Sequence, residues 1–178
     1  MNDLLKKLKL IQTLTTRVEM QQQDFVAKLR EHVDEGSLGI FSDTFDVFST
    51  TDNEFKGHVG PQDFKIKRRK KLFSGNANFA IAKGTFKQEY ETLIIHTEIN
   101  GFRKLFIPFF IFALIIYPTL VVTFLSSDTD NGSGLAFALP FILIHGAFMF
   151  GLPYFIMRRS VKKMKYDLER EFHYMTKR

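Results

Sequence analysis

The sequence predicts an α+β protein with three parts: a small cytosolic antiparallel-sheet domain with one or two helices, a two-helix transmembrane hairpin, and a C-terminal amphipathic helix. Residues 105–125 and 135–157 are uncharged, Phe-rich stretches of about 21 and 23 residues, each long enough to cross a bilayer as an α-helix. Before them, apolar and polar residues alternate between turn signals, which is typical of strands. The expected parts are 1–102, 103–157 and 158–178.

The charges around the two stretches predict their orientation. The linker 126–134 has two Asp, no cation and several turn formers, so the spans should be antiparallel neighbours. Basic residues lie on the other side of both spans, before the first and after the second: Arg103, Lys104, Arg158, Arg159, Lys162, Lys163 and Lys165. Such residues mark the cytoplasmic side. We therefore expect a multi-pass protein of the cell inner membrane, with both termini cytoplasmic and the linker outside.

The N-terminal segment and the cysteine count bear on the compartment. Lysines interrupt the leucines between Met1 and Leu14, so no apolar core of a cleavable signal peptide forms, and we expect this region to stay in the cytosol. The chain has no Cys, which excludes disulfides and thiolate chemistry and fits a reducing compartment.

The first 50 residues predict a strand followed by a helix. Apolar residues alternate with polar ones from Leu14 to Met20, and helical spacing replaces this alternation from Gln21 to Val33. Gly36 is the expected stop signal for the helix. Residues 37–50 fit a helix or a strand equally well, and the pattern leaves that choice open.

Four further segments predict strands: 55–59, 64–70, 77–86 and 90–99. The turn signals between them fall at 60–61, 74–76 and 87–89. Short connections of this kind join neighbouring antiparallel strands, so we expect a meander.

The densest charge feature of the chain is a basic run within the second of these segments: Lys65, Lys67, Arg68, Arg69, Lys70 and Lys71. In a strand, Lys65 and Lys67 should face solvent while Phe64 and Ile66 point inward. One interpretation is a surface for anionic lipid headgroups or for a partner. The other is a solvated edge strand whose lysines discourage aggregation. The sequence favours neither.

His145 lies near the middle of the second span, where an ionisable side chain suggests function. Tyr117 and Thr119 are at a comparable depth in the first span and could reach it. The interpretation that we favour is structural: a neutral imidazole that joins the two helices through a hydrogen bond. An ion or proton pathway would need more polar groups than these spans carry.

The C-terminal segment carries an apolar stripe at helical spacing: Val161, Met164, Leu168, Phe172 and Met175. We expect an amphipathic helix that continues from the second span and packs on the cytosolic domain. A coiled coil and a helix lying in the headgroup layer are the alternatives.

No motif indicates catalysis. The five His never fall at metal-ligand spacing, and the chain has no phosphate-binding loop and no nucleophile elbow. We therefore expect no enzyme, no metal and no cofactor. The net charge of +6 is explained by orientation within the membrane and by anionic lipid, so nucleic acid is not expected as a partner.

A set of short apolar and glycine positions recurs through the predicted strands: Phe55-Lys56-Gly57, Val59, Phe64-Lys65-Ile66, Asn78-Phe79, Gly84-Thr85-Phe86 and Thr92-Leu93-Ile94. Followed by a membrane hairpin, this pattern resembles a group of small bacterial inner-membrane proteins with a cytosolic strand-rich module and two spans. The resemblance covers residues 55–125. It implies the fold and the compartment, and it assigns no catalytic residue.

Charge separation suggests the function. Residues 36–63 are acidic and residues 64–104 are basic, which leads us to expect a non-enzymatic membrane-anchored adaptor or interaction module at the inner leaflet. The expected partners are anionic lipid headgroups and another protein or a second copy. The alternative is a homo-oligomeric membrane assembly, such as a pore or a transporter accessory subunit.

Overall fold

The chain divides into two units, one built on a sheet and one built on two long helices. The computed structural model describes residues 2–39, 53–69, 79–126 and 133–177, and the side chains of 133–137 are left out of that description. Unit 1 comprises 1–102 and 157–178, and unit 2 comprises 103–156. The expectations for 40–50, Lys70, Lys71, the turn at 74–76 and most of the linker fall outside the described residues, and residues 37–39 are neither helix nor strand.

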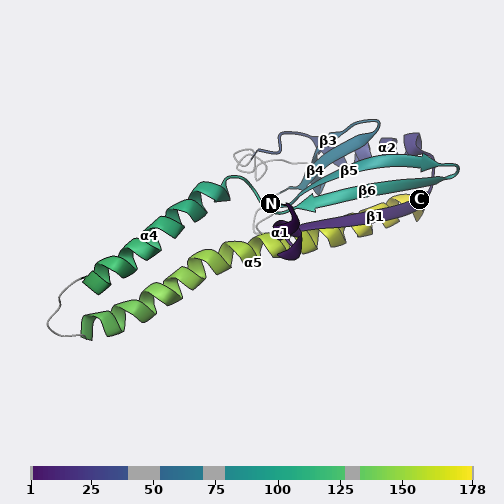
Figure 1. Ribbon diagram of the computed structural model, residues 1–178. Coiled ribbons are helices and arrows are strands. Elements are labelled where there is room, and N and C mark those ends of the chain that lie inside the picture. Colours follow the sequence, from purple (N-terminus) through teal and green to yellow (C-terminus); the bar gives the residue numbers. More distant parts are fainter. Residues whose placement is uncertain (1, 40–52, 70–78, 127–132, 178) are drawn as a thin grey trace. The chain divides into compact units, whose positions relative to one another are not determined.

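Unit 1 is organised by one mixed sheet of six strands in the order β1-β6-β5-β4-β3-β2 (Figure 1). The strands are β1 (Ile11–Glu19), β2 (Val33–Glu35), β3 (Phe55–Val59), β4 (Asp63–Arg68), β5 (Ile81–Glu89) and β6 (Thr92–Asn100). The meander from β3 to β6 is confirmed, because each consecutive pair is antiparallel. The prediction of a purely antiparallel sheet was wrong, since β2 pairs in parallel with β3. A strand of three residues is too short to show a periodicity.

The predicted strand and helix at the N-terminus are confirmed, with changed bounds. Strand β1 pairs along its whole length with β6, from Ile11 opposite Asn100 to Glu19 opposite Thr92. Helix α2 (Gln22–Glu31) follows and ends before the predicted Val33. Val33 instead lies in β2 opposite Phe55 and is buried in the core, so strand pairing ends the helix before Gly36 is reached.

The prediction of a turn at 87–89 was wrong. These three residues belong to β5 and lie opposite Ile94, Leu93 and Thr92 of β6. The connection is the pair Tyr90–Glu91, and Tyr90 adopts a left-handed backbone angle φ of 54°. Polar residues at an exposed strand end resemble a turn in sequence, which explains the error.

Two helices bury one face of this sheet. Helix α2 and the C-terminal part of helix α5 (Ser133–Lys177) lie on the same side of the strands in Figure 1. The Phe172 ring of α5 lies 5.4 Å from the Phe25 ring of α2 and 6.1 Å from the Phe64 ring of β4, measured between centroids. The predicted packing of the C-terminal stripe on the domain is confirmed, because all of its members are buried in this core: Val161, Met164, Leu168, Phe172 and Met175.

Two helices are long and apolar enough to cross a membrane. Helix α4 (Phe106–Ser126) has a mean hydropathy of 2.3, and the apolar part of α5 reaches 1.7. Helix α5 runs without a break from Ser133 to Lys177, so the second stretch and the C-terminal amphipathic segment are one helix. A short helix, α1 (Asn2–Lys7), precedes the sheet.

Candidate functional site

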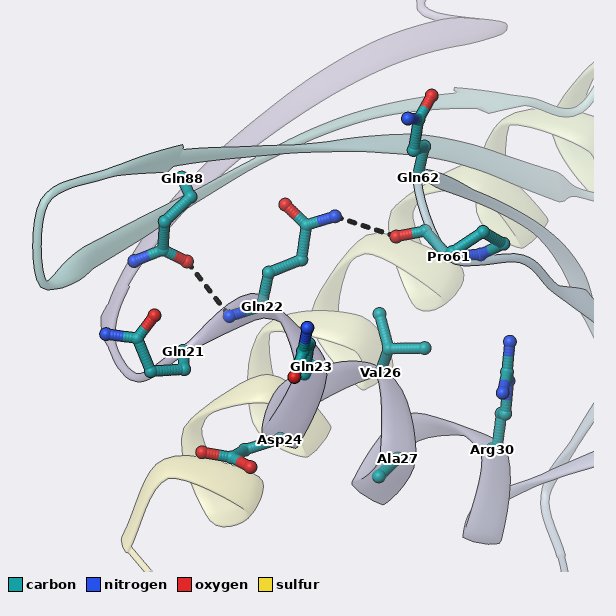
Figure 2. A pocket seen from close by; sticks show the side chains of 10 residues that line it. All are labelled: Gln21, Gln22, Gln23, Asp24, Val26, Ala27, Arg30, Pro61, Gln62 and Gln88. Carbon is teal, nitrogen blue, oxygen red and sulfur yellow. Dashed lines mark hydrogen bonds between the residues drawn. The ribbon is translucent and has the colours of Figure 1, made fainter.

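A polar cleft of about 740 Å³ lies at one end of the sheet in unit 1 (Figure 2). It is formed by α2 and the residue before it, the turn between β3 and β4, and the end of β5. Half of its lining residues are glutamines. The lining consists of Gln21, Gln22, Gln23, Asp24, Val26, Ala27, Arg30, Pro61, Gln62 and Gln88.

Gln22 ties the three walls of this glutamine cleft together. Its backbone N–H, the first of α2, donates to Oε1 of Gln88 at 2.9 Å. Its side-chain Nε2 donates to the carbonyl oxygen of Pro61 at 2.7 Å, and both bonds are drawn in Figure 2. The first N–H groups of a helix have no acceptor within the helix. Gln21 provides no side-chain cap, and the Oε1 atom of Gln88 serves as the acceptor instead.

The turn that carries Pro61 and Gln62 is held by backbone bonds. The N–H of Gly60 donates to the carbonyl of Asp63 at 2.8 Å, and the N–H of Phe86 donates to the carbonyl of Gln62 at 3.0 Å. In Figure 2 the amide of Gln62 points away from the cleft floor. The backbone of this wall is therefore fixed while the amide at its rim stays exposed.

Arg30 provides the cation of the cleft. Its Nε donates to the carbonyl oxygen of Val59 at 3.0 Å, which fixes the guanidinium against the end of β3. Among the residues that the structure describes, Arg30 forms no ion pair. Because the bond to Val59 engages Nε alone, the outer guanidinium nitrogens can donate hydrogen bonds to a carboxylate or carbonyl oxygen.

The five glutamines and Arg30 can bind a ligand but are poorly suited to proton transfer, and Asp24 is the one carboxylate of the lining. Glutamine amides donate and accept hydrogen bonds without titrating near neutral pH, and a guanidinium stays protonated. In the described part of the chain, no group of three or more His, Cys, Asp or Glu could hold a metal ion. The cleft was missed in the sequence, where its only local signal is the run Gln21 to Gln23.

The described cations of the basic run do not form one surface. Lys65 is exposed, but the expectation that Lys67 faces solvent was wrong, because Lys67 is only 2% exposed. The two share a face as predicted, yet the chain covers that face at Lys67, whose Nζ donates to the carbonyl of Gly39 at 2.8 Å. The neighbour of Lys67 across the strands, Lys56, is likewise buried.

The two described arginines of the run form ion pairs inside unit 1. Arg68 contacts Asp167 of α5 at 2.5 Å and Glu54 at 3.1 Å, and Arg69 contacts Asp34 at 2.7 Å. Burial raises the pKa of the Asp167 carboxyl, while the nearby Arg68 opposes this shift. The arginines therefore hold the domain together, and their charge is largely compensated.

In unit 2, Tyr117 and His145 are brought together as the sequence suggested. The Tyr117 hydroxyl lies 2.6 Å from Nδ1 of His145. Thr119 does not join them, because its hydroxyl donates to the carbonyl of Ile115 on its own helix at 2.8 Å. The pair therefore links α4 to α5.

No family model, no curated protein and no solved structure matches this chain.

Proposed function

We propose that the chain is a non-enzymatic, membrane-anchored interaction module. In this proposal α4 and the apolar part of α5 form a transmembrane hairpin in a bacterial cytoplasmic membrane. Unit 1 lies at the inner leaflet and binds a protein partner in the glutamine cleft.

The main support for membrane anchoring is the exposure of large apolar side chains along both helices. Phe112, Leu114 and Phe141 are 65%, 67% and 70% exposed. Contiguous apolar surface of this extent is costly in water and is relieved in hydrocarbon. The acidic linker and the basic residues beyond both spans favour the orientation with unit 1 in the cytosol.

The lining of the cleft supports binding as its role. Exposed amides at Gln21, Gln23 and Gln62 can pair with the N–H and C=O groups of a peptide backbone. Arg30, held through Nε, suits an acidic side chain of the same segment. The expected partner is therefore an extended protein segment that carries a carboxylate.

Lipid contact is proposed for a different set of cations from the basic run. Lys67, Arg68 and Arg69 form hydrogen bonds or ion pairs within unit 1. We therefore assign headgroup binding to exposed cations next to the spans. These are Lys104, Arg159 and Lys162. Each cation near an anionic surface contributes about 1 kcal/mol.

Photo-crosslinking in native membranes tests the partner site. A photoreactive residue at Gln62, on the rim of the cleft, should give a discrete adduct with another protein. The matched control is the same residue at Tyr90, which is 98% exposed and lies outside the cleft lining. Adding Arg30→Gln should weaken the Gln62 adduct, because the cleft loses its only cation. Adducts of equal strength from both positions, or none from Gln62, would refute the cleft as the partner site.

A further inference from the structure

The hydrogen-bonded pair of Tyr117 and His145 has unused hydrogen-bonding groups among the residues that the structure describes. Nδ1 of His145 is engaged by the Tyr117 hydroxyl at 2.6 Å, while the imidazole stacks on Phe141 with ring centroids 6.0 Å apart. Among the described residues, no partner contacts Nε2 of His145. The nearest polar candidate in sequence, Thr119, is already bonded to Ile115.

Both tautomers of His145 leave the pair with unused hydrogen-bonding groups. If the Tyr117 hydroxyl donates to Nδ1, then the Nε2 proton is a spare donor and the hydroxyl oxygen is a spare acceptor. If Nδ1 donates to the hydroxyl oxygen, then the hydroxyl proton is the spare donor and Nε2 is the spare acceptor. In either state the pair holds one unused donor and one unused acceptor.

Such groups are costly within a bilayer. Hydrocarbon offers no water to satisfy them, so an unpaired polar group at this depth favours any arrangement that supplies a partner. His145 is exposed on the surface of the described hairpin, where that partner can approach it.

The helices meet closely beside the polar pair. The Tyr117 ring occupies the space beside Gly146, where an added Cβ would lie 3.4 Å from Cε1 of Tyr117, so the small residue lets α4 and α5 approach each other. The apolar groove of about 530 Å³ that Tyr117 and Ala147 line does not include His145. A partner helix would therefore reach the pair from the exposed side of His145, where Phe141 also lies.

We propose that a second copy of this chain completes the pair. The pair carries one unused donor and one unused acceptor, so it is complementary to a second copy of itself. Around a two-fold axis, the unused donor of each copy would face the unused acceptor of the other. Tyr117 of each copy would bond His145 of the other, which is an isologous contact. This inference depends on the proposed membrane anchoring, but it does not depend on the glutamine cleft.

The test is energy transfer between donor-labelled and acceptor-labelled copies in liposomes, measured as the protein-to-lipid ratio is varied. Because the chain has no Cys, Lys177→Cys provides a single labelling site on the full-length protein. Wild type should form a dimer. His145→Leu and Tyr117→Phe should each raise the dissociation constant about tenfold or more, because either change removes both bonds between the copies.

Two further variants sharpen the result. Thr119→Val removes a hydroxyl with a partner on its own helix and should leave the dissociation constant within about twofold. The double variant His145→Leu/Tyr117→Phe should be no weaker than either single variant, since the two residues act as one unit.

Three outcomes would overturn the inference. One is a wild-type protein that remains monomeric in liposomes, which would mean that another group satisfies the pair. Another is a dimer that both single variants leave unchanged. The last is release of the protein from membranes by alkaline carbonate, which would also refute the proposed anchoring, whereas the first two would leave it intact.

Discussion

Arg68 on β4 and Asp167 on α5, 99 positions apart, form an ion pair of 2.5 Å that joins the sheet to the C-terminal part of the long helix. Only 4% of the Asp167 side chain is exposed, compared with 18% for Arg68. An ion pair this sheltered from water is hard to break, because one charge would then remain buried alone. The contact explains why a charge from the basic run is needed inside the domain.

Arg68→Met should destabilise the protein by about 3 kcal/mol, because Asp167 would lose its closest cation while staying buried. The measurement is denaturant unfolding of the detergent-solubilised full-length protein, followed by circular dichroism. Lys65→Met on the same strand is the matched control, and it should change the free energy of unfolding by less than about 0.5 kcal/mol because Lys65 is exposed. Equal losses in the two variants would contradict this role of Arg68.

Asp167→Asn should alter the pH dependence of stability. The pKa of Asp167 is raised above its ordinary value of 3.8, so the native state binds this proton more tightly than the unfolded state does. The contribution of the carboxyl is therefore most favourable below pH 3.8 and declines as pH rises through the native pKa.

The asparagine variant lacks this decline and can still accept a hydrogen bond from Arg68. Its unfolding free energy relative to wild type should increase as the pH is raised from about 3 to about 7. Thermal unfolding of both proteins at several pH values provides the measurement. A difference that stays constant, or that decreases over this range, would contradict the raised pKa.

Gly57→Ala should be severely destabilising. Gly57 has a φ of 153°, and an added Cβ would lie 2.1 Å from the carbonyl oxygen of Lys65 on the neighbouring strand. We expect a loss of about 3 kcal/mol or more, or failure to fold. The matched control is Gly36→Ala, where the nearest atom would lie at 3.8 Å. Wild-type unfolding of the Gly57 variant would show that β3 and β4 are not packed this closely.

Phe172→Ala should cost about 3 to 5 kcal/mol, because this fully buried ring contacts both Phe25 and Phe64. Tyr174→Ala, two residues along the same helix and 58% exposed, should have a small effect. Denaturant midpoints for the two variants provide the comparison. Similar midpoints would argue against docking of α5 on the sheet through Phe172.

Local signals were enough to predict most elements of the fold. Turn residues such as Gly60 and Pro61 separate β3 from β4, and the spacing from Val161 to Met175 identified the buried face of α5. These features depend on periodicities of a few residues, which a single sequence contains.

The functional geometry was harder to predict because it depends on pairings between distant residues. Lys67 bonds to Gly39 across 28 positions, and Gln22 bonds to Gln88 across 66 positions. Neither contact has a local pattern. Tyr117 and His145 were the exception, since a short linker between two helices constrains which depths can meet.

Single-cysteine accessibility shows directly whether a membrane hairpin holds unit 1 in the cytosol. The chain has no native Cys, so Asp130→Cys in the linker and Gln62→Cys in the cleft can each be labelled alone with a membrane-impermeant thiol reagent. We expect the linker cysteine to react in cells whose inner membrane is intact, and the cleft cysteine to react only after that membrane is permeabilised. Labelling of the cleft cysteine with the inner membrane intact, or a linker cysteine that reacts only after permeabilisation, would contradict this expectation.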